Sequence, residues 1–163
     1  MLRRLFLGTL WLLLLLLLLL LATPKRVSGT GSQYVCPVTR PQYPPFVPPA
    51  PYPTNAGWGG FWYGTDALWV RLNFDGTWYG GGEKLFLWKK GYDWRKEPTP
   101  EIIVTEERLD VESKPMVAKG GTNAIMGHVA AMLTSTSIMA PGCWEITAQH
   151  GADKLTFVVS VKP

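Results

Sequence analysis

The sequence has few of the residue types that build catalytic and metal sites. It contains only two histidines, His128 and His150, and two cysteines. The histidines do not stand at a metal-ligand spacing, and no nucleophile, base and orienting group form a recognisable set. We therefore interpret both histidines as surface residues and predict no catalytic residue, metal site, cofactor or enzymatic activity. Hydrolase chemistry would need two carboxylates that only folding brings together.

Acidic residues are absent before Asp66, and their absence explains much of the formal charge of +4. Four of the sixteen basic residues flank an N-terminal apolar run, whereas from residue 30 onward twelve basic side chains balance twelve acidic ones. A neutral chain without a basic stripe lacks the electrostatics that dominate nucleic-acid affinity. Nucleic acid is therefore not an expected partner.

Residues 1–29 have the composition of an export leader. Arg3 and Arg4 precede an apolar run from Leu5 to Ala22, an order typical of a secretory signal peptide. The run of 18 residues also reaches the lower limit for spanning a bilayer, and its cleavage-site pattern is weak. The leader is thus either a cleaved signal peptide or a signal anchor that holds the protein in the membrane through residues 5–22. Both alternatives predict an extracytoplasmic location, secreted or membrane-anchored.

Residues 30–56 are predicted to form a proline-rich linker. Eight prolines lie between Pro37 and Pro53, interleaved with the aromatic residues Tyr43, Phe46 and Tyr52. Because proline fixes φ and removes a hydrogen-bond donor, this stretch should run extended, as polyproline II or loop. A stiff spacer between the membrane and the following domain is one interpretation, and a ligand role for the prolines is another.

Residues 57–163 show the alternation of a domain of short β-strands. Ala67–Phe74 places apolar and other side chains at a period of two. Asp75-Gly76 is then typical of a tight hairpin turn that leads into Thr77–Tyr79. The charged pair Glu106-Glu107 has the appearance of another hairpin tip.

The C-terminal pattern is the clearest in the domain. Cys143–His150 and Lys154–Val161 both alternate, and the short connection between them contains Gly151, so they predict a hairpin. Ala130–Met139 is rich in Ser and Thr, which favours a strand over a short helix. Six to eight such strands predict an all-β fold, an immunoglobulin-like antiparallel β-sandwich preceded by an N-terminal hydrophobic helix and the proline-rich segment.

Several blocks of residues resemble a group of uncharacterised bacterial exported proteins. The resemblance covers roughly residues 34–163 and implies a bacterial, exported protein with a single immunoglobulin-like domain. That group has no assigned activity, so the resemblance assigns no functional residue. It is carried by these blocks: Cys36–Thr39, Phe61–Gly64, Ala67–Val70, Lys89–Arg95, Pro141–Ala148 and Leu155–Val159.

The two cysteines predict a disulfide bond between Cys36 and Cys143. Exported proteins with an even number of cysteines commonly use them in this way. The bond would join the start of the proline-rich segment to the final hairpin, so that this segment would pack alongside the sandwich. The alternative is a pair of buried free thiols.

Aromatic residues are dense between positions 58 and 94, where twelve occur. On the outer face of a sandwich such rings can stack on sugars or anchor a protein partner, or they can form the core. Trp69 and Trp88 stand opposite the apolar faces of their strands, which predicts that the proline-rich segment covers one face of the sheet. The candidate ligand-binding residues are Trp58, Trp62, Trp78, Trp88 and Trp94.

The functional prediction combines the leader, the strand pattern and the missing catalytic set. They indicate a non-enzymatic extracytoplasmic β-sandwich, a structural or protein-binding module of the bacterial envelope. A carbohydrate-binding module that uses exposed aromatic residues is the alternative. The expected partner is therefore an envelope protein or a glycan whose identity the sequence does not specify.

Overall fold

The computed structural model describes residues 34–57, 59–80, 84–138 and 140–163. The predicted leader, the first residues of the predicted linker and Trp58 lie outside these described residues. Within them the chain forms ten β-strands and no helix, so the prediction of an all-β fold is confirmed, with more strands than expected. No helix in this part of the chain is long and apolar enough to span a membrane.

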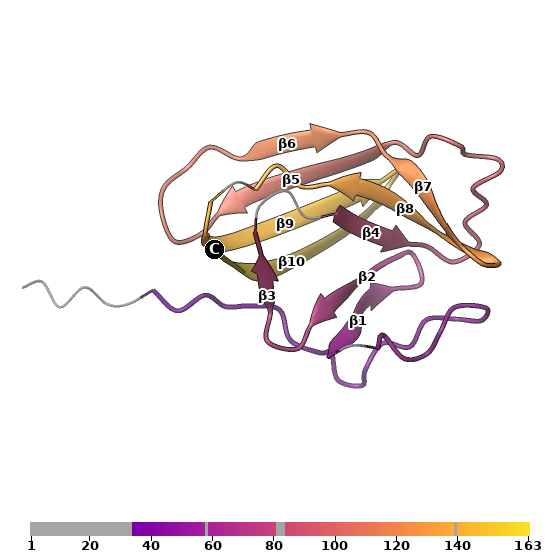
Figure 1. Cartoon of the computed structure of the whole chain (residues 1–163), viewed down its shortest axis with the longest axis horizontal. Coiled ribbons are helices and arrows are strands. Elements are labelled where there is room, and N and C mark those ends of the chain that lie inside the picture. Colours follow the sequence, from indigo (N-terminus) through magenta and orange to yellow (C-terminus); the bar gives the residue numbers. More distant parts are fainter. Residues whose placement is uncertain (1–33, 58, 81–83, 139) are drawn as a thin grey trace, which may run out of the picture. The chain divides into compact units, whose positions relative to one another are not determined.

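The strands make two five-stranded sheets that pack as a β-sandwich (Figure 1). Sheet A has the order β1 (Gly60–Thr65), β2 (Leu68–Asn73), β4 (Lys84–Trp88), β8 (Val129–Ser135) and β7 (Thr122–Met126). Sheet B has the order β3 (Thr77–Tyr79), β10 (Asp153–Lys162), β9 (Gly142–His150), β5 (Ile102–Arg108) and β6 (Met116–Lys119). The two sheets and residues 34–56 belong to one compact unit, Tyr34–Pro163.

The core lies between the inner faces of the two sheets. β10 buries every second side chain from Leu155 to Val161, and β9 does the same from Trp144 to Ala148. These strands pair antiparallel with Phe157 opposite Ile146, which confirms the predicted C-terminal hairpin. β2 supplies the facing side chains Leu68, Val70 and Leu72. Burying an aliphatic or aromatic side chain of this size stabilises a fold by about 1.5–3 kcal/mol. The strands therefore pack with their apolar faces turned toward each other.

The hairpin predicted at Asp75-Gly76 is wrong. The turn forms, with the Asp75 carboxylate accepting a hydrogen bond from the Thr77 N–H at 2.9 Å, but it carries the chain from sheet A to sheet B. β3 then pairs in parallel with β10, with Thr77 opposite Ser160. The turn residues predict a change of direction, whereas the neighbouring strand is chosen by the distant β10. The sandwich therefore contains one parallel pair and is not wholly antiparallel.

The hairpin tip predicted at Glu106-Glu107 is also wrong. Both residues lie within the continuous strand β5, which pairs with β9 on one side and with β6 on the other. Glu106 points inward and is fully buried opposite Ile146, whereas Glu107 is exposed. A buried glutamate is rare enough that two adjacent acidic residues are usually exposed at a turn. The strand predicted within Ala130–Met139 is confirmed by β8.

Candidate functional site

The outer face of sheet A carries a row of aromatic side chains. Trp69 in β2 lies opposite Trp88 in β4, and Trp62 in β1 lies opposite Arg71 in β2. Because successive side chains of a strand point to opposite faces, the inward Leu68 and Val70 direct Trp69 outward. The rings of Trp62 and Trp88 meet edge to face, with centroids 5.0 Å apart and planes at 81°.

Residues 41–56, named here the proline-rich cover, pack on this face beside β1 and β2 (Figure 1). The rings of Phe46 and Tyr52 lie 5.7 Å and 5.0 Å from the Trp69 ring. The Tyr52 hydroxyl donates a hydrogen bond to the Lys89 carbonyl at 3.2 Å, and its burial raises the pKa of that hydroxyl. Trp69 is consequently fully buried although it points away from the central core.

A second hydrogen bond fixes the end of the cover. The indole N–H of Trp62 donates to the carbonyl of Pro53 at 3.0 Å. Proline lacks a backbone N–H, so the carbonyls of a proline-rich segment meet few internal donors and remain available to a donor such as Trp62. The cover turns at its middle, where the Tyr52 N–H donates to the Pro49 carbonyl at 3.1 Å. Trp62 therefore recognises the backbone of the cover while its ring packs against Trp88.

Beyond the cover the same face is hollowed by a pocket of about 440 Å³, named here the tryptophan pocket. The rings of Phe86 and Trp88 stack in its wall, with centroids 6.2 Å apart and planes at 22°. Arg71 contributes the one charged group among the described lining residues. Its size and apolar, aromatic lining are those of a ligand-binding pocket. The apolar walls are formed by Pro53, Ala56, Trp62, Phe86, Trp88, Met126 and Val129.

A larger hollow, of about 540 Å³, lies on sheet B and differs in character. Its described lining includes Glu101, Lys119 and Gln149 beside Ile102 and Ile103, but no aromatic ring. It thus lacks the aromatic side chains that commonly line ligand-binding pockets. The tryptophan pocket is therefore the stronger candidate site.

The predicted ligand-binding tryptophans do not form one cluster. Trp62 and Trp88 contribute to the tryptophan pocket, with 9% and 7% of their surface exposed. Trp78 packs edge-on against Phe157 at the inner core, with centroids 6.0 Å apart, and it lines a separate hollow of about 350 Å³ together with Trp88. Trp94 lies between β4 and β5 beneath the guanidinium of Arg95, at 4.5 Å. Trp58 lies outside the described residues.

Sequence reasoning missed the partners of these tryptophans. Phe86, Met126 and Val129 come from three different strands, and only the register of sheet A brings them to one pocket. One signal was present in the sequence, because Phe86 and Trp88 stand two residues apart and therefore share a face. Met126 and Val129 face each other across the β7–β8 turn, a pairing that the local sequence does not specify.

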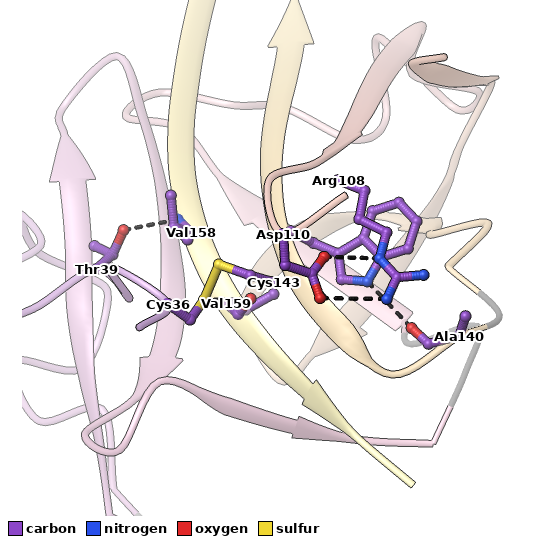
Figure 2. The surroundings of a disulfide bond; sticks show 9 residues. Cys36, Thr39, Arg108, Asp110, Ala140, Cys143, Val158 and Val159 are labelled. Carbon is purple, nitrogen blue, oxygen red and sulfur yellow. Dashed lines mark hydrogen bonds and ion pairs between the residues drawn. A yellow bond between two sulfur atoms is a disulfide. The ribbon is translucent and has the colours of Figure 1, made fainter. Parts of the chain in front are cut away.

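The predicted disulfide between Cys36 and Cys143 is confirmed, with Cα atoms 5.4 Å apart (Figure 2). It joins the proline-rich segment to the start of β9. Three residues later the Thr39 N–H donates to the Val158 carbonyl at 2.9 Å, and the Val158 N–H donates to the Thr39 hydroxyl at 2.8 Å. The covalent bond and this reciprocal pair together hold the beginning of the segment on β10.

An ion pair lies beside the disulfide. The guanidinium of Arg108 donates to the carboxylate of Asp110, with Nε 2.7 Å from Oδ1 (Figure 2). This hydrogen bond holds the pKa of Asp110 below its usual range and raises the pKa of Arg108. Arg108 also lies over the Trp144 ring at 5.8 Å. The group packs the loop after β5 onto β9, which is a structural role.

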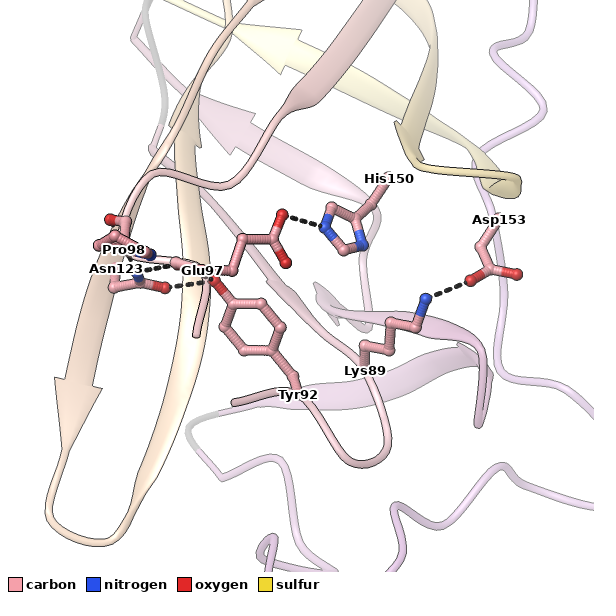
Figure 3. A network of polar contacts seen from close by, with 7 residues as sticks. All are labelled: Lys89, Tyr92, Glu97, Pro98, Asn123, His150 and Asp153. Atoms are coloured by element: carbon pink, nitrogen blue, oxygen red, sulfur yellow. Dashed lines mark hydrogen bonds and ion pairs between the residues drawn. The ribbon is translucent and has the colours of Figure 1, made fainter. Parts of the chain in front are cut away.

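His150 is not the surface residue that the sequence predicted. Its side chain is 12% exposed, and its Nε2 lies 2.8 Å from Oε1 of Glu97 (Figure 3). Nearby, the Tyr92 hydroxyl lies 2.6 Å from Oδ1 of Asn123 and 3.2 Å from the Glu97 carbonyl. These contacts hold the segment between β4 and β5 onto β7 and β9. His128 is exposed at the β7–β8 turn, as predicted.

Glu106 is a buried carboxylate with a structural partner. Both of its oxygens accept the Ser137 backbone N–H, at 2.8 Å and 3.0 Å. Burial raises the pKa of Glu106 above its ordinary value, and the hydrogen bond from Ser137 opposes the shift. The arrangement fixes the chain that follows β8.

Metal-ligating side chains do not gather in the described part of the chain, where no group of three or more His, Cys, Asp or Glu residues could hold an ion. No protein-family model matches the sequence, and no curated protein or solved structure is significantly similar to it. The resemblance to bacterial exported proteins stays a prediction. The tryptophan pocket is the site on which a functional proposal rests.

Proposed function

We propose that the protein is a non-enzymatic, immunoglobulin-like module of the bacterial envelope that binds a protein partner through the tryptophan pocket. The observation that carries the proposal is the pocket itself. Tryptophan, phenylalanine, methionine and arginine are enriched at the cores of protein interfaces, and all four line this pocket. Trp and Arg also dominate among the residues that contribute most to binding energy.

The surroundings of the pocket support a preorganised binding surface. Trp88 is held by Trp62 on one side and lies opposite the buried Trp69. The Arg71 guanidinium donates to the carbonyls of Ala56 at 3.1 Å and Gly57 at 3.3 Å. Side chains fixed in this way lose little conformational freedom when a partner binds, so more of the contact energy appears as affinity.

The disulfide supports the extracytoplasmic location. Disulfides persist in oxidising compartments, whereas cytosolic thiols are kept reduced. The bond between Cys36 and Cys143 spans a sequence separation of 107 residues and ties the beginning of the compact unit to the start of β9. Export through the N-terminal leader would place the unit in such a compartment.

Photo-cross-linking in bacterial cells that produce the full chain tests the proposal. Phe86 is replaced with p-benzoylphenylalanine, which preserves an aromatic side chain at the pocket. The control places the same residue at Val117, which is 56% exposed on β6 of sheet B. We expect a protein adduct from position 86 that position 117 does not give. No adduct at either position, or the same adducts at both, would overturn the proposal; equal secretion and melting temperature of both variants make the comparison valid.

Carbohydrate binding is the second candidate, and one observation favours it. The stacked rings of Phe86 and Trp88 stand beside Arg71 and Asn55, which could donate hydrogen bonds to sugar hydroxyls. The nearly perpendicular rings of Trp62 and Trp88, each less than a tenth exposed, are less suited to a flat sugar platform. If the adduct at position 86 is a glycan that resists protease, the protein binds carbohydrate at this pocket, and the proposal of a protein partner is wrong.

A further inference from the structure

We propose that the tryptophan pocket takes an extended, uncharged, proline-rich segment of the partner. The inference rests on the proposed function, because it names the class of partner that the same pocket binds. The chain's own proline-rich cover already occupies the adjoining half of the outer face of sheet A. The cover is thus an example, within the same chain, of a proline-rich segment bound to this face.

The cover is held mainly by its aromatic rings and its backbone carbonyls. Two rings pack on Trp69, and the carbonyls of Pro53 and Ala56 accept from Trp62 and Arg71. Two side-chain hydrogen bonds add to these contacts, from the Tyr52 hydroxyl to the Lys89 carbonyl and from the Gly64 N–H to Gln42 Oε1. Extended proline-rich segments suit aromatic surfaces because their backbone is already ordered and their carbonyls are free. The loss of conformational entropy on binding is therefore small.

The tryptophan pocket continues the surface that the cover occupies. Pro53 and Ala56, at the end of the cover, form one wall, and Trp62 is shared between the cover and the pocket. Phe86 of β4 and Val129 of β8 also line it. A partner segment placed here would lie between the cover and the β7–β8 hairpin and would extend an existing interface.

The charges of the site favour an uncharged ligand. None of the described lining residues is acidic, and the single guanidinium of Arg71 is already directed to backbone carbonyls and to Asn73 Oδ1. The cover itself, residues 41–56, contains no charged residue. A basic segment would lose hydration in this pocket without gaining an ionic partner, and an acidic segment would have to compete with the carbonyl and amide oxygens that already accept from Arg71.

A peptide titration tests the inference. The probe is a synthetic peptide with the sequence of residues 41–56, and its matched control has every proline replaced by alanine. Both are titrated into the oxidised full chain in detergent micelles, with affinity measured by anisotropy of a label on the peptide. We expect the proline peptide to bind at least tenfold more tightly than the alanine peptide. Equal affinities would overturn the inference.

Methionine-methyl NMR of the same complex locates the bound peptide. Met126 lines the pocket and is 44% exposed, whereas Met132 is fully buried in the central core. The Met126 methyl signal should shift on titration and the Met132 signal should not. A Met126 signal that stays unshifted while the labelled peptide is bound would mean that the peptide binds elsewhere, for example in place of the cover, and would refute the proposed site.

Matched variants complete the test. Val129→Lys places a charge in the pocket wall, and Val117→Lys places one at an exposed position of sheet B. Val129→Lys should weaken peptide binding at least tenfold, and Val117→Lys should leave it unchanged. Binding that Val129→Lys does not alter would overturn the inference, provided that both variants melt as the parent does.

The two proposals can fail separately. If the peptide does not bind but position 86 still cross-links to a protein, the inference fails and the proposed function stands. If the cross-linked protein is a second copy of this chain, the occupant is the chain itself and the inference of a separate proline-rich partner fails. If neither the peptide nor a protein engages the pocket, both proposals fail.

Discussion

Removing the disulfide between Cys36 and Cys143 should lower the free energy of unfolding substantially. The variant is the double substitution Cys36→Ala and Cys143→Ala, which leaves no single reactive thiol. In the chain-entropy model, a cross-link between residues 107 positions apart stabilises the fold by about 5 kcal/mol at 25 °C. For a unit of the length of Tyr34–Pro163, such a loss corresponds to a fall in melting temperature of about 18 °C.

The effect should arise mainly in the unfolded state. The reciprocal hydrogen bonds between Thr39 and Val158 do not depend on the cysteines, and neither does the bond from Arg40 to the Phe74 carbonyl at 2.7 Å. These contacts should hold residues 36–40 in place in the folded double variant. Its tryptophan emission before unfolding should therefore match that of the parent.

Urea unfolding followed by tryptophan fluorescence measures the loss. The oxidised parent, the reduced parent and the double variant are compared, and the last two should coincide. A difference of less than about 1 kcal/mol between oxidised parent and double variant would refute the reasoning. A changed emission spectrum before the transition would instead show that the disulfide is needed for the native packing of the segment.

Three further predictions concern the core, the cover and a glycine of β1. The raised pKa of Glu106 means that the folded protein binds its proton more tightly than the unfolded chain, so stability should fall as the pH rises above the ordinary value of 4.5. In Glu106→Gln the free energy of unfolding, measured by urea titrations at a series of pH values, should not show this fall. If the variant keeps the pH dependence of the parent, the fall does not come from Glu106. Trp69→Ala should cost about 3–5 kcal/mol, because its fully buried ring joins the cover to sheet A; a loss below about 1 kcal/mol would show that the cover does not pack as described. Gly64→Ala should be much more damaging than Gly80→Ala, since at φ 134° its Cβ would lie 2.3 Å from a backbone carbonyl oxygen, whereas at Gly80 nothing lies within 4 Å. Equal melting temperatures of these two alanine variants would contradict that contact.

The sequence predicted the fold where the signal is local. The alternation in Cys143–His150 and Lys154–Val161 defines two strands and their inner faces, and a short connection leaves the hairpin as the natural pairing. The prediction failed at Asp75-Gly76, where the turn was correct but the partner strand was not. Strand choice depends on contacts far apart in the chain, and here β10 provides a neighbour that no local pattern reveals.

Burial on both faces of sheet A was also foreseen in part. Trp69 alternates with the inward-facing Leu68 and Val70, so its own side chain lies on the outer face of the sheet. An apolar side chain of this size on the outer face needs another segment to cover it. The structure places Phe46 and Tyr52 on that face. The tryptophan pocket was predicted only by Trp62 and Trp88, because Val129 and Phe86 reach it through the register of β4, β8 and β7.

The most direct test of the account is competition at the pocket. Cells or envelopes carrying p-benzoylphenylalanine at position 86 are irradiated with an excess of the proline-rich peptide of residues 41–56, and in parallel with its alanine counterpart. The account predicts that the proline peptide abolishes the protein adduct and that the alanine peptide leaves it intact. An adduct that persists equally with both peptides would contradict the claim that the partner enters the tryptophan pocket as a proline-rich segment.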